Sequence, residues 1–133
     1  MACEISVEVK EGYLHLRVAG ENTVENVHHY LAATIAACLT HKISSVLIEE
    51  NLSGPSLDVL EIYRIAASES QSAAPAVQRV AYVDMNPEHI AARMNFAAAV
   101  ASEHGMDIRF FLAVDRAEDW MRGEIRADKR RPG

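Results

Sequence analysis

A continuous apolar run followed by a turn is the feature that most constrains the fold of this chain. Residues Val46–Ile48 contain no polar side chain, which is typical of a strand covered on both faces. Gly54–Pro55 then predicts a turn, and Ser56 belongs to the residue types that cap helices. In α/β sheets, ligands and modifications gather where strands end and helices begin. We therefore expect function in the segment 46–58.

The rest of the chain predicts strands and helices in alternation. Residues 3–10 and 13–18 alternate apolar and polar side chains around Glu11–Gly12, which predicts an antiparallel hairpin. Apolar residues at helical or strand spacing define the other elements. We expect helices at 23–40, 57–68 and 87–104, a short last helix carrying Ala117, Trp120 and Met121, and strands at 43–50, 77–83 and 107–114.

Local signals predict where the helices begin and end. The expected N-terminal caps are Asn22 with Glu25, Ser56, Asn86 before Pro87, and Asp115 with Glu118. In the second helix, Val59, Leu60, Ile62, Tyr63 and Ala66 are expected to form the apolar face. Gly105 is expected to end the third helix.

The resulting order is ββαβαβαβα, an α/β fold. The last three strands each follow a helix, so we expect them to be parallel and joined by right-handed crossovers. This gives a five-stranded mixed sheet with an N-terminal hairpin and helices packed on it. We expect one domain over residues 1–121. Residues 122–133 carry five basic and two acidic side chains and are expected to form a flexible basic tail.

Composition limits the functional classes. The chain has 133 residues, half of them hydrophobic, and its net charge of −6 argues against a nucleic-acid partner. Two isolated cysteines, Cys3 and Cys38, form no disulfide framework and no metal-binding spacing. They indicate a reducing, cytoplasmic compartment. Acidic residues occupy the N-terminal stretch, which argues against a signal peptide, and no apolar run reaches the length of a membrane span.

Several segments together resemble a known family. They are VLIEENLSGPSLDVLEIYRIA, VQRVAYVDMNPEH and MNFAAAVASEHGMDIRFFLAVDRAEDWM, which contains Ile108–Phe111 and the pair Ala117 and Trp120. With the element order, they are similar to STAS domains, which have the anti-sigma-factor-antagonist fold, and in particular to SpoIIAA-like proteins. The resemblance covers most of residues 3–121. These motifs are mainly core signatures, so they specify fold better than chemistry.

The resemblance implies two functional options. In phosphorylated STAS proteins, a serine at the start of the helix after the third strand is the switch, in a pattern like Asp-Ser-Ser-Gly-Leu. This chain has Gly54–Asp58 there instead, so Ser56 is the nearest match and Ser53 the second. The alternative for Ser56 is a plain helix cap. The fold is also similar to Sec14-type domains, which implies a small apolar or lipid-like ligand as the second option.

Polar residues at the ends of strands form a second group of candidates. We expect Glu49, Glu50, Asn51, Asp84 and Asp115 to line the carboxyl edge of the sheet, with His89 facing it as an acid or base. Carboxylates gathered there raise one another's pKa values or bind a divalent cation. The alternative is ordinary capping chemistry. Because no recognised metal-ligand spacing is present, the sequence predicts no metal and no cofactor.

Three hypotheses follow. The first is a non-enzymatic module that contacts another protein or itself as a homodimer, through the 49–64 region, including Asp58 and Tyr63, and the 68–76 loop. The second is a binding protein for a small apolar ligand between the sheet and the second and third helices. The third is an enzyme or metal site at the acidic edge. The chain has no P-loop, no dinucleotide-binding glycine motif, no Gly-x-Ser-x-Gly, no His-Glu-x-x-His and no Cys-x-x-Cys.

Overall fold

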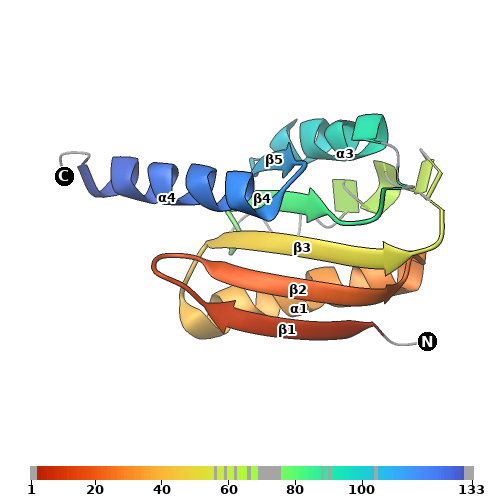
Figure 1. The fold of residues 1–133 in the computed structure, drawn as a ribbon, viewed down its shortest axis with the longest axis horizontal. Helices are drawn as coiled ribbons and strands as arrows, with labels where there is room; N and C mark the ends of the chain where they lie inside the picture. Colours follow the sequence, from red (N-terminus) through yellow and green to blue (C-terminus); the bar gives the residue numbers. More distant parts are fainter. Residues whose placement is uncertain are drawn as a thin grey trace.

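Five strands form one mixed sheet in the order β1-β2-β3-β4-β5 (Figure 1). The computed structural model describes residues 3–55, 57–58, 60–61, 63–65, 67–68, 76–87, 89, 91–103 and 105–130, without the side chains of 91–94, 101, 129 and 130. The strands are β1 (Glu4–Val9), β2 (Leu14–Glu21), β3 (Ser45–Ser53), β4 (Arg79–Asp84) and β5 (Asp107–Phe111). The helices are α1 (Val24–His41), α3 (Ala91–Glu103) and α4 (Val114–Arg130), and the described residues of 60–68 are also helical. This α/β architecture confirms the predicted fold class.

Strand pairing follows the predicted pattern and extends it. β1 and β2 are antiparallel, and the turn between them is closed by the Lys10 amide, which donates to the Tyr13 carbonyl at 2.8 Å. β2, β3, β4 and β5 are all parallel to one another. The predicted parallel run is therefore confirmed, and β2 belongs to it as well. In this register Glu50 of β3 lies beside Asp84 of β4.

Helices cover the two faces of the sheet. Helix α1 packs on β2 and β3 on one face, and α4 packs on β3, β4 and β5 on the other (Figure 1). Alternating residues of β3 enter separate cores, because successive side chains of a strand point to opposite faces. Val46 and Ile48 join the core under α1, whereas Leu47 joins the core under α4. The double coverage explains the unbroken apolar run in β3.

The start of α1 corrects one prediction. The N-cap is Thr23, whose hydroxyl accepts a hydrogen bond from the Asn26 amide at 3.1 Å, and not Asn22. The side-chain amide of Asn22 instead donates to the carbonyl of Pro55. At the other end, Lys42 adopts a left-handed conformation with φ of 55°, and its amide bonds to the carbonyl of Cys38. Both cysteines, Cys3 and Cys38, are free and buried.

Several expected element boundaries also differ from the structure. β3 continues to Ser53, α3 begins at Ala91 and not at Pro87, and β5 ends at Phe111. Asp115 is in the first turn of α4 and not its N-cap, since the helix begins at Val114. Gly105 has the left-handed φ of 91° expected after the end of a helix.

The segment 57–68 differs from the predicted helix in its start and its apolar face. Ser56, the predicted cap, lies outside the described residues. Asp58 and Glu61 form a reciprocal cap, in which the Asp58 carboxylate accepts from the Glu61 amide at 2.9 Å. The predicted apolar face is wrong at Leu60 and Tyr63, which are exposed, whereas Ile65 is buried. Outside the described residues lie Val59, Ile62, Ala66 and most of the predicted 68–76 loop, namely 69–75.

Helix α4 is longer than expected. It continues past Met121 to Arg130, so the expectation of a short last helix is wrong. The described part of the predicted tail contacts the rest of the chain, because Arg79 of β4 lies 3.0 Å from Asp128 and 3.8 Å from Glu124. Ile125 packs on the core under α4. It also lies beside Gly12, where an added Cβ would be 3.0 Å from the isoleucine side chain. Residues 131–133 lie outside the described residues.

The core under α4 includes the one tryptophan of the sequence. Trp120 lies beside Phe111, with ring centroids 5.6 Å apart, and the guanidinium of Arg109 is 5.1 Å from the indole ring. These contacts make Trp120 part of the packing between α4 and β5. Among the residues that the structure describes, no helix combines the length and the apolar character needed to cross a membrane.

The length of α4 generates a test of stability. Ile125→Ala removes apolar contacts with the core and should lower the free energy of unfolding by roughly 1–2 kcal/mol, less than for a fully buried isoleucine. Urea unfolding measures this change. Arg126→Ala on the exposed side of the same turn is the control and should change stability little. Equal stability of both variants and the unmodified chain would mean that residues 122–130 are a free tail.

Candidate functional site

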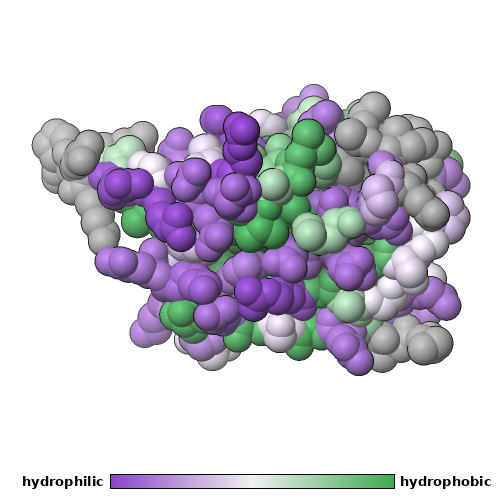
Figure 2. Space-filling view, in the orientation of Figure 1, coloured by the Kyte–Doolittle hydropathy of each residue, from purple (hydrophilic) through white to green (hydrophobic). Residues whose placement is uncertain are grey.

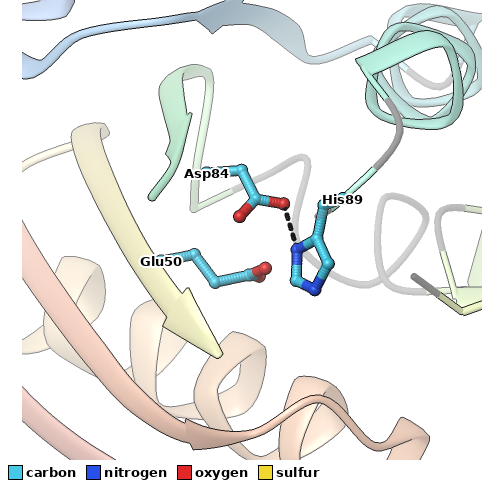
Figure 3. Close-up of side chains that lie close together, drawn as sticks. All are labelled: Glu50, Asp84 and His89. Carbon is cyan, nitrogen blue, oxygen red and sulfur yellow. Dashed lines mark hydrogen bonds and ion pairs between the residues drawn. The ribbon is translucent and has the colours of Figure 1, made fainter. Parts of the chain in front are cut away.

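Three ionisable side chains converge at the carboxyl end of the sheet. They are Glu50 from β3, Asp84 from the last position of β4, and His89 from the segment between β4 and α3 (Figure 3). One ligand-type atom from each lies within 4.8 Å of the others. The parallel register places Glu50 and Asp84 side by side. The loop that follows β4 then returns His89 to the same place.

Asp84 and His89 form a buried pair. The Nδ1 atom of His89 lies 2.6 Å from Oδ2 of Asp84, and the two side chains are only 2% and 3% exposed. The other carboxylate oxygen, Oδ1, accepts a hydrogen bond from the backbone amide of Asn86 at 3.0 Å. Burial of a charged pair is tolerated only when its remaining hydrogen-bonding atoms also find partners. Both oxygens of Asp84 have one.

Glu50 lies beneath this pair and is held by two tyrosines. Its residue surface is 3% exposed, and its carboxylate accepts hydrogen bonds from the hydroxyls of Tyr30 and Tyr82. Burial raises the pKa of Glu50 because the charged form loses its hydration, and the tyrosine hydrogen bonds oppose this change. Burial and the neighbouring Glu50 also raise the pKa values of both tyrosines well above the ordinary value.

The second ring nitrogen of His89 faces the turn after β3. Nε2 lies 2.9 Å from the carbonyl oxygen of Gly54, and 3.3 Å from the side-chain amides of Asn22 and Asn86. A backbone carbonyl can only accept a hydrogen bond, so the short contact with Gly54 places a proton on Nε2. His89 therefore connects the end of β4 to the turn.

Two asparagines complete the attachment of this turn. Asn22 donates to the carbonyl of Pro55 at 2.9 Å, and Asn86 donates to the carbonyls of Leu52 and Gly54 at 2.8 and 3.3 Å. Together with His89, three side chains from two segments, one after β2 and one after β4, contact the carbonyls of Leu52, Gly54 and Pro55. The turn at which the sequence predicts function is thus held from beneath by the polar cluster.

This arrangement is a poor acid–base catalyst. A histidine that moves protons in catalysis needs one ring nitrogen free to reach the substrate. In His89, one nitrogen is paired with Asp84, the other contacts Gly54, and the side chain is almost inaccessible. The geometry favours a role in holding the turn or in binding an ion over direct proton transfer.

A small pocket opens beside the cluster. Its volume is about 320 Å³, and its lining residues are Asp84, Met85, Asn86, Pro87, His89, Phe110 and Leu112. Three of them are polar and four are apolar, which resembles the mixed lining of small-ligand sites. Figure 2 shows apolar surface close to where β5 ends and α4 begins, and Leu112 in that connection is 85% exposed.

The other candidate residues do not join the cluster. Glu49 points to the opposite face, where Oε1 lies 3.1 Å from Nε2 of His15 and 3.6 Å from Nε of Arg17. The reason is the alternation of side chains along β3. Asn51 is exposed, as are Asp58, Tyr63 and Asp115. Ser53 is exposed and its hydroxyl donates to the Gly20 carbonyl at 3.1 Å.

Sequence patterns did not identify Tyr30 and Tyr82 as partners of Glu50. They also did not predict that Asn22 and Asn86 hold the turn after β3. Tyr30 follows Val27 by three residues on the apolar side of α1, which is a signal for a buried hydroxyl that needs a partner. Tyr82 precedes Asp84 by two residues and therefore shares its face of β4. Asn22 directly follows a strand of the parallel run, although sequence reasoning treated it as a cap.

Removal of the Glu50 charge should change how stability depends on pH. Folding raises the pKa of Glu50, so the folded chain binds this proton more tightly than the unfolded chain does. The resulting stability is complete at a pH below the pKa in the unfolded chain. It is lost as the pH rises through the pKa in the folded chain. Glu50→Gln avoids this loss. The variant should therefore gain stability relative to the unmodified chain between about pH 4.5 and neutral pH.

Urea unfolding at a series of pH values, with a chelator present, measures this difference. The expected gain is about 1.4 kcal/mol for each unit by which folding raises the pKa. Glu11→Gln, at an exposed acidic residue in the turn between β1 and β2, controls for the general loss of one acidic side chain. Parallel stability curves for Glu50→Gln and the unmodified chain would contradict a raised pKa at Glu50.

No family model matches this chain, and no curated protein is significantly similar to it. Among solved structures, an uncharacterized protein of the DUF3478 family with a SpoIIAA-like fold, from Shewanella loihica PV-4, is similar with a TM-score of 0.51. The two chains are 21% identical, and the match covers 90% of this chain and 94% of the other. At this level of identity the likeness defines the fold: the chain has a SpoIIAA-like fold, as its sequence motifs predict.

Proposed function

We propose that this chain is a non-enzymatic regulatory module that binds another protein, or a second copy of itself, through the turn after β3 and the helical segment that follows. The observation that carries this proposal is the attachment of the turn. Three side chains fix its carbonyls from beneath, whereas Ser53, Pro55 and Asp58 are exposed at the surface. A rigid, outward-facing turn loses little conformational entropy when a partner binds.

Exposed apolar side chains support the same surface. Leu60 and Tyr63 are 57% and 50% exposed, and they lie one helical turn apart. The Tyr63 ring stacks on Phe96 of α3, itself 38% exposed, with ring centroids 6.2 Å apart. Aromatic residues that are only half covered are enriched at protein interfaces. An apolar partner surface would cover these rings.

Charge indicates the chemistry of the partner. The net charge of the chain is −6, and the acidic residues Asp58 and Glu61 lie on the same segment as Leu60 and Tyr63. Complementary potentials accelerate association and exclude wrong partners. The proposed partner therefore presents an apolar patch bordered by basic side chains. The buried Asp84–His89 pair leaves no accessible ring nitrogen for catalysis, which supports a binding role over an enzymatic one.

A double variant, Leu60→Ser with Tyr63→Ser, tests the surface. Both side chains are half exposed, so the variant should still fold. Truncation of central interface residues of this kind lowers affinity by about tenfold or more, so binding of the partner should weaken by at least that factor. Photo-crosslinking from position 64, combined with sedimentation of the purified chain, identifies whether the partner is another protein or a second copy. Leu39→Ser, at an equally exposed leucine on α1, is the matched control. Unchanged association of the double variant with every partner would contradict the proposal.

The pocket beside the cluster supports a second candidate function, the binding of a small apolar ligand. Met85, Phe110 and Leu112 provide apolar contacts, and Asp84 provides a polar end. This pocket is at the ends of β4 and β5, away from the location between the sheet and two helices that the sequence suggests.

Ligand binding would stabilise the folded chain by mass action. Gently purified protein should therefore melt at a higher temperature than the same protein after delipidation. Leu112→Gln should remove the difference by placing a polar group at the pocket rim. Identical melting temperatures before and after delipidation would exclude a retained apolar ligand.

A further inference from the structure

We propose that Glu50, Asp84 and His89 bind one divalent transition-metal cation, for which Zn²⁺ and Mn²⁺ are suitable probes. The three side chains come from separate segments and direct two carboxylates and one imidazole nitrogen toward one point (Figure 3). Their ligand atoms all lie within 4.8 Å of one another. Ligands bound to one such cation at about 2.0–2.2 Å are about 3–4 Å apart, so small rotations of these side chains suffice.

The orientation of His89 matches that of a metal ligand. Histidines that bind metals usually donate a hydrogen bond from the other ring nitrogen to a carbonyl or carboxylate, which fixes the tautomer. Here Nε2 lies 2.9 Å from the carbonyl of Gly54, which can only accept. The proton on Nε2 leaves Nδ1 as the nitrogen that faces Asp84, and Nδ1 is the atom proposed to bind the cation.

Both carboxylates are held in a comparable way. Asp84 accepts a hydrogen bond from the Asn86 amide at 3.0 Å through the oxygen that does not contact His89. Glu50 accepts from the hydroxyls of Tyr30 and Tyr82. Such outer hydrogen bonds restrict the rotation of metal ligands and strengthen binding. Each of the three proposed ligands thus has a partner that holds it in place.

The charge of the cluster suits a divalent cation. Two ionised carboxylates and a neutral imidazole carry a total charge of −2 in a buried site. Isolated buried carboxylates are costly, and a cation that contacts both removes most of this cost. In the metal-free chain, the contact between Nδ1 of His89 and Oδ2 of Asp84 occupies this position. When the cation binds, the proton on Nδ1 leaves to solvent and the nitrogen lone pair forms the new bond.

Access and ligand type restrict the cation further. The pocket lined by Asp84 and His89 marks the side from which a cation would enter, because both side chains are only 3% and 2% exposed in the metal-free chain. An imidazole nitrogen favours zinc, iron and related metals, whereas magnesium and calcium favour oxygen ligands alone. The site shares His89 with the attachment of the turn after β3, but it uses none of the exposed residues of the proposed interaction surface.

A second histidine–carboxylate pair provides an internal comparison. On the opposite face, Nε2 of His15 lies 3.1 Å from Glu49, but Arg17 is 3.6 Å from the same carboxylate oxygen. A guanidinium at that distance repels a cation, and no second carboxylate is part of this pair among the described residues. Glu49→Gln is therefore the matched control for Glu50→Gln.

The test uses full-length, tag-free protein stripped with a chelator. Equilibrium dialysis against Zn²⁺ and Mn²⁺ should give one bound cation per chain, and the melting temperature should rise with added metal. Asp84→Asn and Glu50→Gln should weaken binding at least about tenfold, whereas Glu49→Gln should not. Mg²⁺ at the same concentration should have a smaller effect.

Nitrogen NMR of the histidines in the unmodified chain decides the case even if a variant fails to fold. On addition of Zn²⁺, the Nδ1 signal of His89 should shift by many ppm while Nε2 keeps its proton. No stoichiometric binding, equal binding by Asp84→Asn, or a metal-induced shift confined to other histidines would each overturn the proposal. None of these outcomes depends on partner binding, so the proposed function and the metal site fail separately.

Discussion

The parallel pairing of β3 with neighbours on both sides is the constraint on which the rest of the structure depends. Leu14 of β2 and Val80 of β4 both lie beside Val46 in the register, and the run Val46–Ile48 is covered by a helix on each face. Because all of these strands point in one direction, their carboxyl ends meet at one edge. Glu50 and Asp84 are brought together by this geometry alone, without any local sequence motif.

The buried polar cluster couples segments that are far apart in the chain. Its hydrogen bonds reach from Asn22 after β2, across the turn at Gly54, to His89 before α3. Each group in such a network is expensive to leave unpaired, so loss of one member affects the others. The turn therefore responds to changes at β4 although the two segments are not neighbours in sequence. A cation at this place would act on the same hydrogen bonds.

Sequence patterns predicted what depends on periodicity and failed where distant side chains intervene. Alternation and apolar runs located all five strands along the chain, because strand and helix periods are local properties. The order of the strands in the sheet is not a local property, and the sequence did not predict it beyond the parallel run. Asn22 was misassigned as a cap because its amide binds Pro55, 33 residues away. The length of α4 was underestimated, since Arg79 and a core contact of Ile125 stabilise it from outside the helix. Contacts with residues so far away in the chain cannot be predicted from the pattern of a short segment.

The position of the tryptophan has a practical consequence. Trp120 is the one tryptophan of the sequence and packs against Phe111 under α4, on the face of the sheet opposite to Glu50 and α1. Its fluorescence therefore reports the docking of the C-terminal helix and is insulated by the sheet from events on the other side. A titration followed at this tryptophan thus monitors the C-terminal half of the molecule alone, without any added label.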